Sequence, residues 1–161
     1  MKRSDFYLLL KPVTDKLYRM AFCLIPDDLQ AEQLVIDSLN AFLIKEKKNI
    51  LAMPEYETLS KKDILIKRRT SFKGVLKYMG DIGVRRASQL KDQLNASRPV
   101  EFTKFYNLEP KVRLVFTLRY DFQFTTEEIE DITAMPRYEV IEKIHNGRFL
   151  LMNDMNQGAS L

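Results

Sequence analysis

The stretch that decides the fold is LEPKVRLVFTLRYDFQFTTEEIEDITAMPRYEVIEKIHNGRFLL, residues 108–151. Its pattern predicts a helix, a second short helix, a tight turn and a third helix. Thr125 stands three residues before Glu128. That is the spacing of a capping box, so we expect the second helix to begin there. Pro136 cannot continue this helix, but it suits the first turn of the next one.

Apolar residues recur at helical spacing in the first and third of these helices. Pro110 introduces the first helix, and its apolar positions are Val112, Val115, Phe116 and Leu118. One face of the third helix carries Val140, Ile144, Gly147 and Leu151. That spacing leaves one side of the helix to pack and the other side free. Two short helices joined by a tight turn on a supporting helix predict a helix-turn-helix.

The composition favours an all-α protein. The chain has 161 residues, enough for one domain or two small ones. Glycine and proline are few, and runs of β-branched residues are short. The single cysteine, Cys23, rules out an internal disulfide and is expected to be a buried small hydrophobe. The N-terminus lacks a signal-peptide layout, and no apolar run approaches the ~20 residues that span a bilayer, so we expect a cytoplasmic protein.

Two helices are predicted at the N-terminal end of the chain. Residues 5–24 have a helical pattern that Pro12 interrupts, which predicts a kink or two separate helices. After a break, Asp27 or Asp28 caps the next helix, which we expect over residues 29–48. The buried face of this helix is predicted to hold Ala31, Leu34, Val35, Ser38 and Phe42.

The middle of the chain is less regular. Over residues 49–70 we expect a loop followed by a short basic helix. Ser71 then opens a further helix, whose apolar face holds Phe72, Val75, Leu76, Met79, Ile82 and Gly83. A polar, proline-containing linker follows. The predicted organisation is a helical domain over 1–92, a linker over 93–102, a helix-turn-helix domain over 103–155 and a tail over 156–161.

The C-terminal stretch also matches the pattern of a known family. The matching positions are Leu108-Glu109-Pro110, Arg113, Phe116, Leu118-Arg119-Tyr120, Thr126-Glu127-Glu128-Ile129, Met135-Pro136, Val140 and residues 145–148. With these residues it resembles the fourth region of bacterial sigma factors, in particular the small, two-domain extracytoplasmic-function type. The resemblance implies a domain that reads the −35 promoter element. A generic helix-turn-helix, or simply a three-helix packing unit, is the alternative interpretation.

Residues 17–21, 26–28 and 31–39, with Phe42, are similar to the second region of the same family. In that family, a helix of this region docks on a coiled coil of the β′ subunit of RNA polymerase. Carried over to this chain, the polymerase-binding candidates are Glu32, Gln33, Leu34, Val35 and Asp37. Gln33 stands where the family has an aspartate, and Ile36 stands where it has a glutamine. The alternative is an amphipathic helix whose leucine and valine side chains belong to the core.

Positive charge gathers in the middle of a chain whose net charge is +4. A cluster of positive side chains such as this can bind the phosphates of nucleic acids, or it can be a helix face that is only exposed to solvent. The resemblance implies that the helix opened by Ser71 reads the −10 promoter element, although Val75 replaces the family's tryptophan and Ile82 its asparagine. Bases that are flipped out of the duplex stack on aromatic side chains. In this helix Tyr78 is the aromatic residue that remains near the position where the family contacts such bases. The DNA-binding candidates here are Lys73, Lys77, Tyr78, Arg85 and Arg86.

The predicted recognition helix departs from the family. Where the family has a small residue followed by Thr-Val-Lys-Ser-Arg, this chain has Tyr138-Glu139-Val140-Ile141-Glu142-Lys143. Two carboxylates would repel a polyanion, which weakens phosphate binding. The DNA-binding candidates in this helix are Arg137, Lys143 and Arg148. His145, the single histidine, is expected at the surface or in helix packing.

Two functions follow from these observations. The first is a sigma-like transcription initiation factor that binds RNA polymerase core and promoter DNA. The second is a sigma-like interaction protein that has lost promoter reading and binds an anti-sigma factor, the polymerase or another regulator. The sequence has no nucleophile–base pair, phosphate-binding glycine loop or metal-ligand spacing, so we expect neither an enzyme nor a cofactor.

Overall fold

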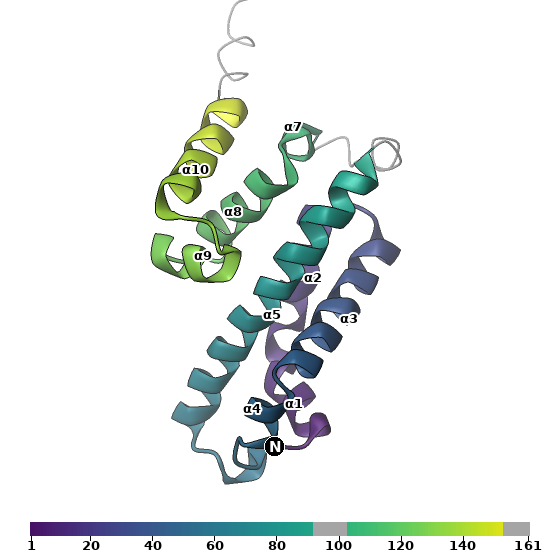
Figure 1. Ribbon diagram of the computed structural model, residues 1–161, viewed down its shortest axis with the longest axis vertical. Helices are drawn as coiled ribbons and strands as arrows, with labels where there is room; N and C mark the ends of the chain where they lie inside the picture. Colours follow the sequence, from purple (N-terminus) through teal and green to yellow (C-terminus); the bar gives the residue numbers. More distant parts are fainter. Residues whose placement is uncertain (92–102, 153–161) are drawn as a thin grey trace, which may run out of the picture.

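A computed structural model describes residues 1–91 and 103–152, and every regular element within those ranges is helical (Figure 1). The all-α prediction is therefore confirmed. The predicted linker at 93–102, the last three residues of the predicted helix-turn-helix domain and the predicted tail at 156–161 lie outside the described residues.

The N-terminal part contains two successive helices, as Pro12 predicted. Helix α1 spans Arg3–Leu10, a 3₁₀ turn η1 spans Lys11–Val13, and α2 spans Thr14–Leu24. Helix α3 spans Asp28–Lys45. The Asp27 carboxylate caps it by accepting a hydrogen bond of 2.9 Å from the Gln30 N–H. The chain bends at Glu46, so the predicted helix over 29–48 is split, and α4 takes Lys47–Leu51.

One long helix, α5, spans Lys61–Gln89 after the 3₁₀ turn η2 at Tyr56–Thr58. The Ser60 hydroxyl caps it by accepting from the Asp63 N–H at 3.1 Å. The prediction of a new helix opening at Ser71 is wrong, because Ser71 is buried in the middle of α5. No glycine or proline interrupts residues 61–73, so the basic segment and the apolar segment continue as a single helix.

Helix α5 approaches α2 and α3 closely at Gly83. A Cβ at this position would lie 2.7 Å from Leu24 Cδ1 and 2.9 Å from Leu34 Cδ2. Only glycine leaves room for those two leucines, so this residue fixes the short distance between the three helices.

The C-terminal part is a helix-turn-helix on a supporting helix. It contains α7 (Thr103–Asn107), α8 (Pro110–Tyr120), α9 (Thr126–Thr133) and α10 (Arg137–Met152). The capping box of Thr125 and Glu128 is present, as predicted. Ala134 begins the turn between α9 and α10 in the left-handed conformation, with φ of 55°. We call α8, α9 and α10 the helix-turn-helix unit.

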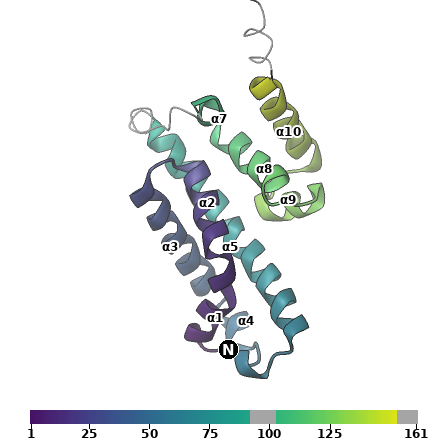
Figure 2. The same ribbon diagram turned by 180° about the vertical axis from the view of Figure 1, so that it is seen from behind.

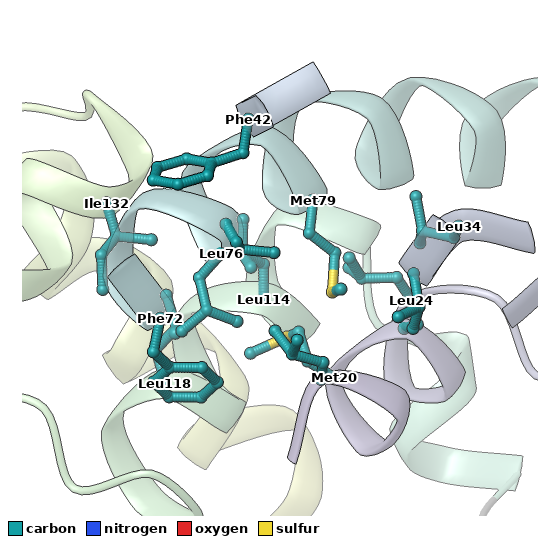
Figure 3. Close-up of a cluster of buried hydrophobic side chains, with 14 of the residues drawn as sticks. Met20, Leu24, Leu34, Phe42, Phe72, Leu76, Met79, Leu114, Leu118 and Ile132 are labelled. Atoms are coloured by element: carbon teal, nitrogen blue, oxygen red, sulfur yellow. The ribbon is translucent and has the colours of Figure 1, made fainter. Parts of the chain in front are cut away.

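This unit and the N-terminal helices share one hydrophobic core (Figure 3). Leu114 and Leu118 of α8 and Ile132 of α9 lie beside side chains of α2, α3 and α5. Figures 1 and 2 show α8 and α9 against α2 and α5, with α10 on the outside. The inner face of α10 buries Val140 and Gly147 and half-buries Ile144 and Leu151, which confirms the predicted packing face.

Candidate functional site

The contact between α5 and α9 is held by one carboxylate and two cations, Glu128, Arg69 and Lys73, which we call the α5–α9 seam. An oxygen of Glu128 accepts from Arg69 Nη2 at 2.6 Å and lies 3.1 Å from Lys73 Nζ. Burial raises the pKa of this carboxyl. The hydrogen bonds from Arg69, the Thr125 N–H and Lys73 outweigh that effect and lower its pKa to about 2. Lys73, a predicted DNA contact, therefore has an anion of its own chain beside it.

A second contact across the two parts of the chain is made by Arg113 of α8, which is 5% exposed. Its Nη1 donates to the carbonyls of Tyr106 at 2.9 Å and Leu108 at 2.8 Å. Its Nη2 donates to the Leu24 carbonyl, at the end of α2, at 2.8 Å. The guanidinium thus supplies hydrogen-bond donors to a carbonyl at the end of α2 and to two carbonyls in the segment that precedes α8.

The structure pairs a predicted polymerase contact with a predicted DNA contact. Arg86 Nη2 of α5 donates to Asp37 Oδ2 of α3 at 2.6 Å, and both side chains are about half-buried. The hydrogen bond from Arg86 outweighs burial and lowers the pKa of the Asp37 carboxyl. Gln33 Nε2 donates to the other carboxylate oxygen at 2.8 Å. Asp37 and Arg86 therefore stabilise the bundle, and neither is presented to a partner as an isolated charge.

Two of the polymerase-binding candidates are core residues. Leu34 is fully buried and Val35 is 8% exposed, as the predicted buried face of this helix requires, so neither side chain is accessible to a docking partner in this structure. Their positions on α3 face α2 and α5, where their burial stabilises the fold. Glu32 and Gln33 are exposed, as predicted for a docking surface. They lie beside Leu29, which is 78% exposed, and Ile36, which is 51% exposed. We call these four exposed residues the α3 outer face.

Three of the DNA-binding candidates line one cleft between α5 and the helix-turn-helix unit, with a volume of about 460 Å³. They are Lys77, Tyr78 and Arg85, and Lys111 joins them from α8. Carboxylates reduce the positive charge of the cleft, because Arg85 pairs with Asp81 at 2.9 Å and Lys111 with Glu139 at 3.6 Å. The ring of Tyr78 packs edge-on against Phe42, with centroids 6.1 Å apart, which limits its use as a stacking plane.

The cations of α10 are divided between its two faces. Lys143 lies toward the inner side, where its side chain is 16% exposed and its Nζ is 3.8 Å from a Glu109 oxygen, so this predicted DNA contact has a carboxylate of its own chain beside it. Arg137 is exposed and lies 3.6 Å from a Glu127 oxygen. Arg148 is exposed on the outer side. His145 is exposed there too, in agreement with a surface role.

Cys23, predicted to be a buried small hydrophobe, is half-buried. It lies in an apolar groove of about 430 Å³ between α2 and α8, lined by aromatic rings that include Phe22 and Tyr106. Burial raises the pKa of the Cys23 thiol, which keeps it protonated and weakly reactive.

The α5–α9 seam and the buried Arg113 are the two site features that sequence reasoning missed. Glu128 was predicted as a capping residue, and it has that role. Its partner Arg69, however, lies 59 positions earlier in the chain. The sequence offered one signal for Arg113, its place among the apolar positions of α8.

The chain matches no model of a known protein family and no curated protein. Among the helices of the described residues, none is long and apolar enough to cross a membrane. Within the same residues, no group of three or more histidine, cysteine, aspartate or glutamate side chains could hold a metal ion.

Proposed function

We propose that this protein is a sigma-like regulator that acts through protein contacts and has lost promoter reading. One observation carries the proposal. Cations expected to meet DNA are engaged by carboxylates of the same chain, Lys73 by Glu128 and Arg86 by Asp37. Freeing either cation would break an ion pair that also joins two helices, so DNA would have to compete with the fold.

The outer side of α10 supports the same proposal. In a reading helix this side carries donors for base edges and cations for phosphates. Here it presents Tyr138, Ile141 and Glu142, all of them exposed. An apolar face with a carboxylate is suited to a protein surface and not to a polyanion.

RNA polymerase core is the partner we propose for the α3 outer face. The face lies on the helix that resembles the docking helix of sigma factors. It combines the carboxylate of Glu32 with the exposed side chains of Leu29 and Ile36. Two exposed aliphatic side chains beside a carboxylate provide the apolar centre and polar rim of a protein interface.

The test is binding of the full chain to purified RNA polymerase core, measured by biolayer interferometry. Ile36→Lys should weaken binding at least about tenfold, because it places a cation in the centre of the contact. Ile66→Lys, at a similarly exposed position of α5 (54% against 51% for Ile36), is the matched control and should bind as the natural chain does. No binding of the natural chain, or equal binding by Ile36→Lys, would overturn the polymerase assignment.

Promoter reading is the second candidate, and the cleft between α5 and the helix-turn-helix unit favours it. Lys77, Arg85 and Lys111 all reach this cleft. Lys77 forms no ion pair with another residue in the described part of the chain, so it remains available to a phosphate. A DNA-bound chain would lose affinity when Lys77 is replaced by alanine.

A further inference from the structure

A groove between α1, α3 and α4 lies at the end of the N-terminal helices that is away from the helix-turn-helix unit (Figures 1 and 2). Its volume is about 440 Å³. Two of its lining residues, Met1 and Ile50, are buried, with 6% and 4% exposed. Two others, Ile44 of α3 and Leu51 of α4, are 72% and 62% exposed. A hollow with exposed aliphatic side chains is suited to receive apolar side chains of a partner.

Hydrogen bonds between the surrounding helices fix the shape of this groove. The Met1 nitrogen donates to the Met53 carbonyl at 2.5 Å and to the Leu51 carbonyl at 3.3 Å, which ties the start of α1 to the end of α4. Arg3 Nη2 of α1 donates to Asn40 Oδ1 of α3 at 3.0 Å. The groove therefore exists before a partner binds, which lowers the entropic cost of binding.

The charged side chains that line the groove are both cations, Arg3 and Lys47. Both are exposed, and neither forms an ion pair with another described residue. Two carboxylates are close in the sequence, but neither lines the groove. Glu46 accepts a hydrogen bond from Asn49 Nδ2 at 2.6 Å. Asp5 stands two positions after Arg3, which places it about 200° around the axis of α1. The groove therefore favours an anionic partner.

The shape and the charge of the groove together select the class of partner. A nucleic acid would meet the two cations but would leave Ile44 and Leu51 without apolar contacts. A lipid surface takes up side chains that protrude from a protein, whereas this site is hollow. A helix with aliphatic side chains along one face and carboxylates beside them meets both requirements. Its aliphatic side chains enter the groove, and its carboxylates reach Arg3 and Lys47.

We propose that the groove between α1, α3 and α4 binds an acidic amphipathic helix of another protein. The proposal needs neither polymerase nor DNA, so it goes beyond the proposed function and can fail independently of it. One helix in this groove buries less than the ~800 Å² that each partner buries in a standard interface, so we expect a dissociation constant of about 10 to 100 μM.

Fluorescence anisotropy of a labelled peptide, titrated with the full chain up to about 500 μM, tests the proposal. The probe is a helical peptide of about 18 residues, with leucines along one face and glutamates beside them. A second peptide has lysine in place of each glutamate. We expect the acidic peptide to bind at least about tenfold more tightly than the basic one, because the cations that line the groove attract the first and repel the second.

Substitutions in the chain locate the binding site of the peptide. Leu51→Glu should weaken binding of the acidic peptide at least about tenfold, because it places a carboxylate in the groove. Leu65→Glu, at a position of α5 that is also 62% exposed, is the matched control and should bind as the natural chain does. Lys47→Gln should weaken binding about 2- to 5-fold and reduce its dependence on salt. Circular dichroism checks that all three variants keep their helix content.

Three results would overturn the proposal. They are no binding of the acidic peptide, equal binding of the acidic and basic peptides, and equal losses from Leu51→Glu and Leu65→Glu. Binding of dodecanoate or of phosphatidylglycerol vesicles without binding of the acidic peptide would assign the groove to a lipid and would overturn the proposal as well.

Discussion

Charged and apolar side chains are buried and paired on one side of the helix-turn-helix unit and exposed on the other. On the inner side, Leu114, Leu118 and Ile132 are buried in the common core, and Glu128 and Arg113 have partners across the two parts of the chain. On the outer side, Tyr138 and Phe149 are exposed, and the exposed Glu142 between them forms no ion pair with another described residue.

This difference indicates what each side contributes. The inner side stabilises the fold, because Arg113 and Glu128 make hydrogen bonds across it and its apolar groups are removed from water. The outer side contributes little to the fold, and its exposed apolar side chains are the surface for which we propose protein contacts. Substitutions on the two sides should therefore separate stability from association.

The largest effect on stability is expected from the inner side, at Arg113. Arg113→Met removes the donor of three hydrogen bonds to the carbonyls of Tyr106, Leu108 and Leu24. Leaving these groups without a donor should lower the free energy of unfolding by about 3 kcal/mol. Urea denaturation followed by circular dichroism measures the change. Lys111→Met, on the exposed side of the same helix, is the control and should cost less than about 1 kcal/mol; equal losses would contradict the assigned role of Arg113.

A smaller and pH-dependent effect is expected at the α5–α9 seam. Glu128→Gln should lower the free energy of unfolding by about 1 kcal/mol near neutral pH, because Arg69 is largely exposed and its attraction is screened by solvent. The pKa of Glu128 is lowered from its ordinary value of 4.5 to about 2 in the folded chain. The stabilisation is therefore complete above pH 4.5 and is lost as the pH falls from there toward 2.

The measurement for this prediction is the difference in unfolding free energy between the natural chain and Glu128→Gln from pH 2 to 7. It should shrink toward zero at the acidic end. Glu127→Gln, the neighbouring position, is the control, because Glu127 is exposed and its partner Arg137 lies 3.6 Å away at the surface. A difference that does not change with pH would mean that the seam contributes no electrostatic stability.

The smallest effect on stability is expected from the outer side. Phe149→Lys should change the free energy of unfolding by less than about 0.5 kcal/mol in dilute solution, because the ring is already in contact with water. Thermal unfolding at low protein concentration measures it. A large destabilisation would show that the outer side of α10 belongs to the folded core, and the comparison between the two sides would fail.

The local features of this fold could be predicted from the sequence. The Asp27 cap, the break at Pro12 and the capping box of Thr125 and Glu128 depend on residues within a few positions of each other, so their spacing identifies them. The continuity of α5 was missed for a local reason. Ser71 is a residue type that caps helices, and only the packing around it shows that it is buried within one.

The contacts that define the candidate site could not be predicted in this way. Arg113 reaches a carbonyl 89 positions away, and Arg86 reaches a carboxylate 49 positions away. Neither pairing leaves a periodic signal in the sequence. The resemblance assigned Asp37 and Arg86 to two different partners, and the structure places them in one ion pair. For Leu34 and Val35 the two kinds of prediction differed: the helix pattern placed them on the buried face, where they lie, whereas the resemblance assigned them to docking.

The central claim is that this chain acts through protein contacts and does not read promoters. Fluorescence anisotropy of a labelled promoter-length duplex, titrated with the full chain, tests it most directly. At about 150 mM salt we expect the anisotropy to stay close to the value of free DNA up to about 10 μM protein, about tenfold below the ~100 μM weak limit of non-specific binding. Binding at low micromolar protein that weakens steeply with added salt, and that Lys77→Ala reduces, would contradict the claim and favour promoter reading.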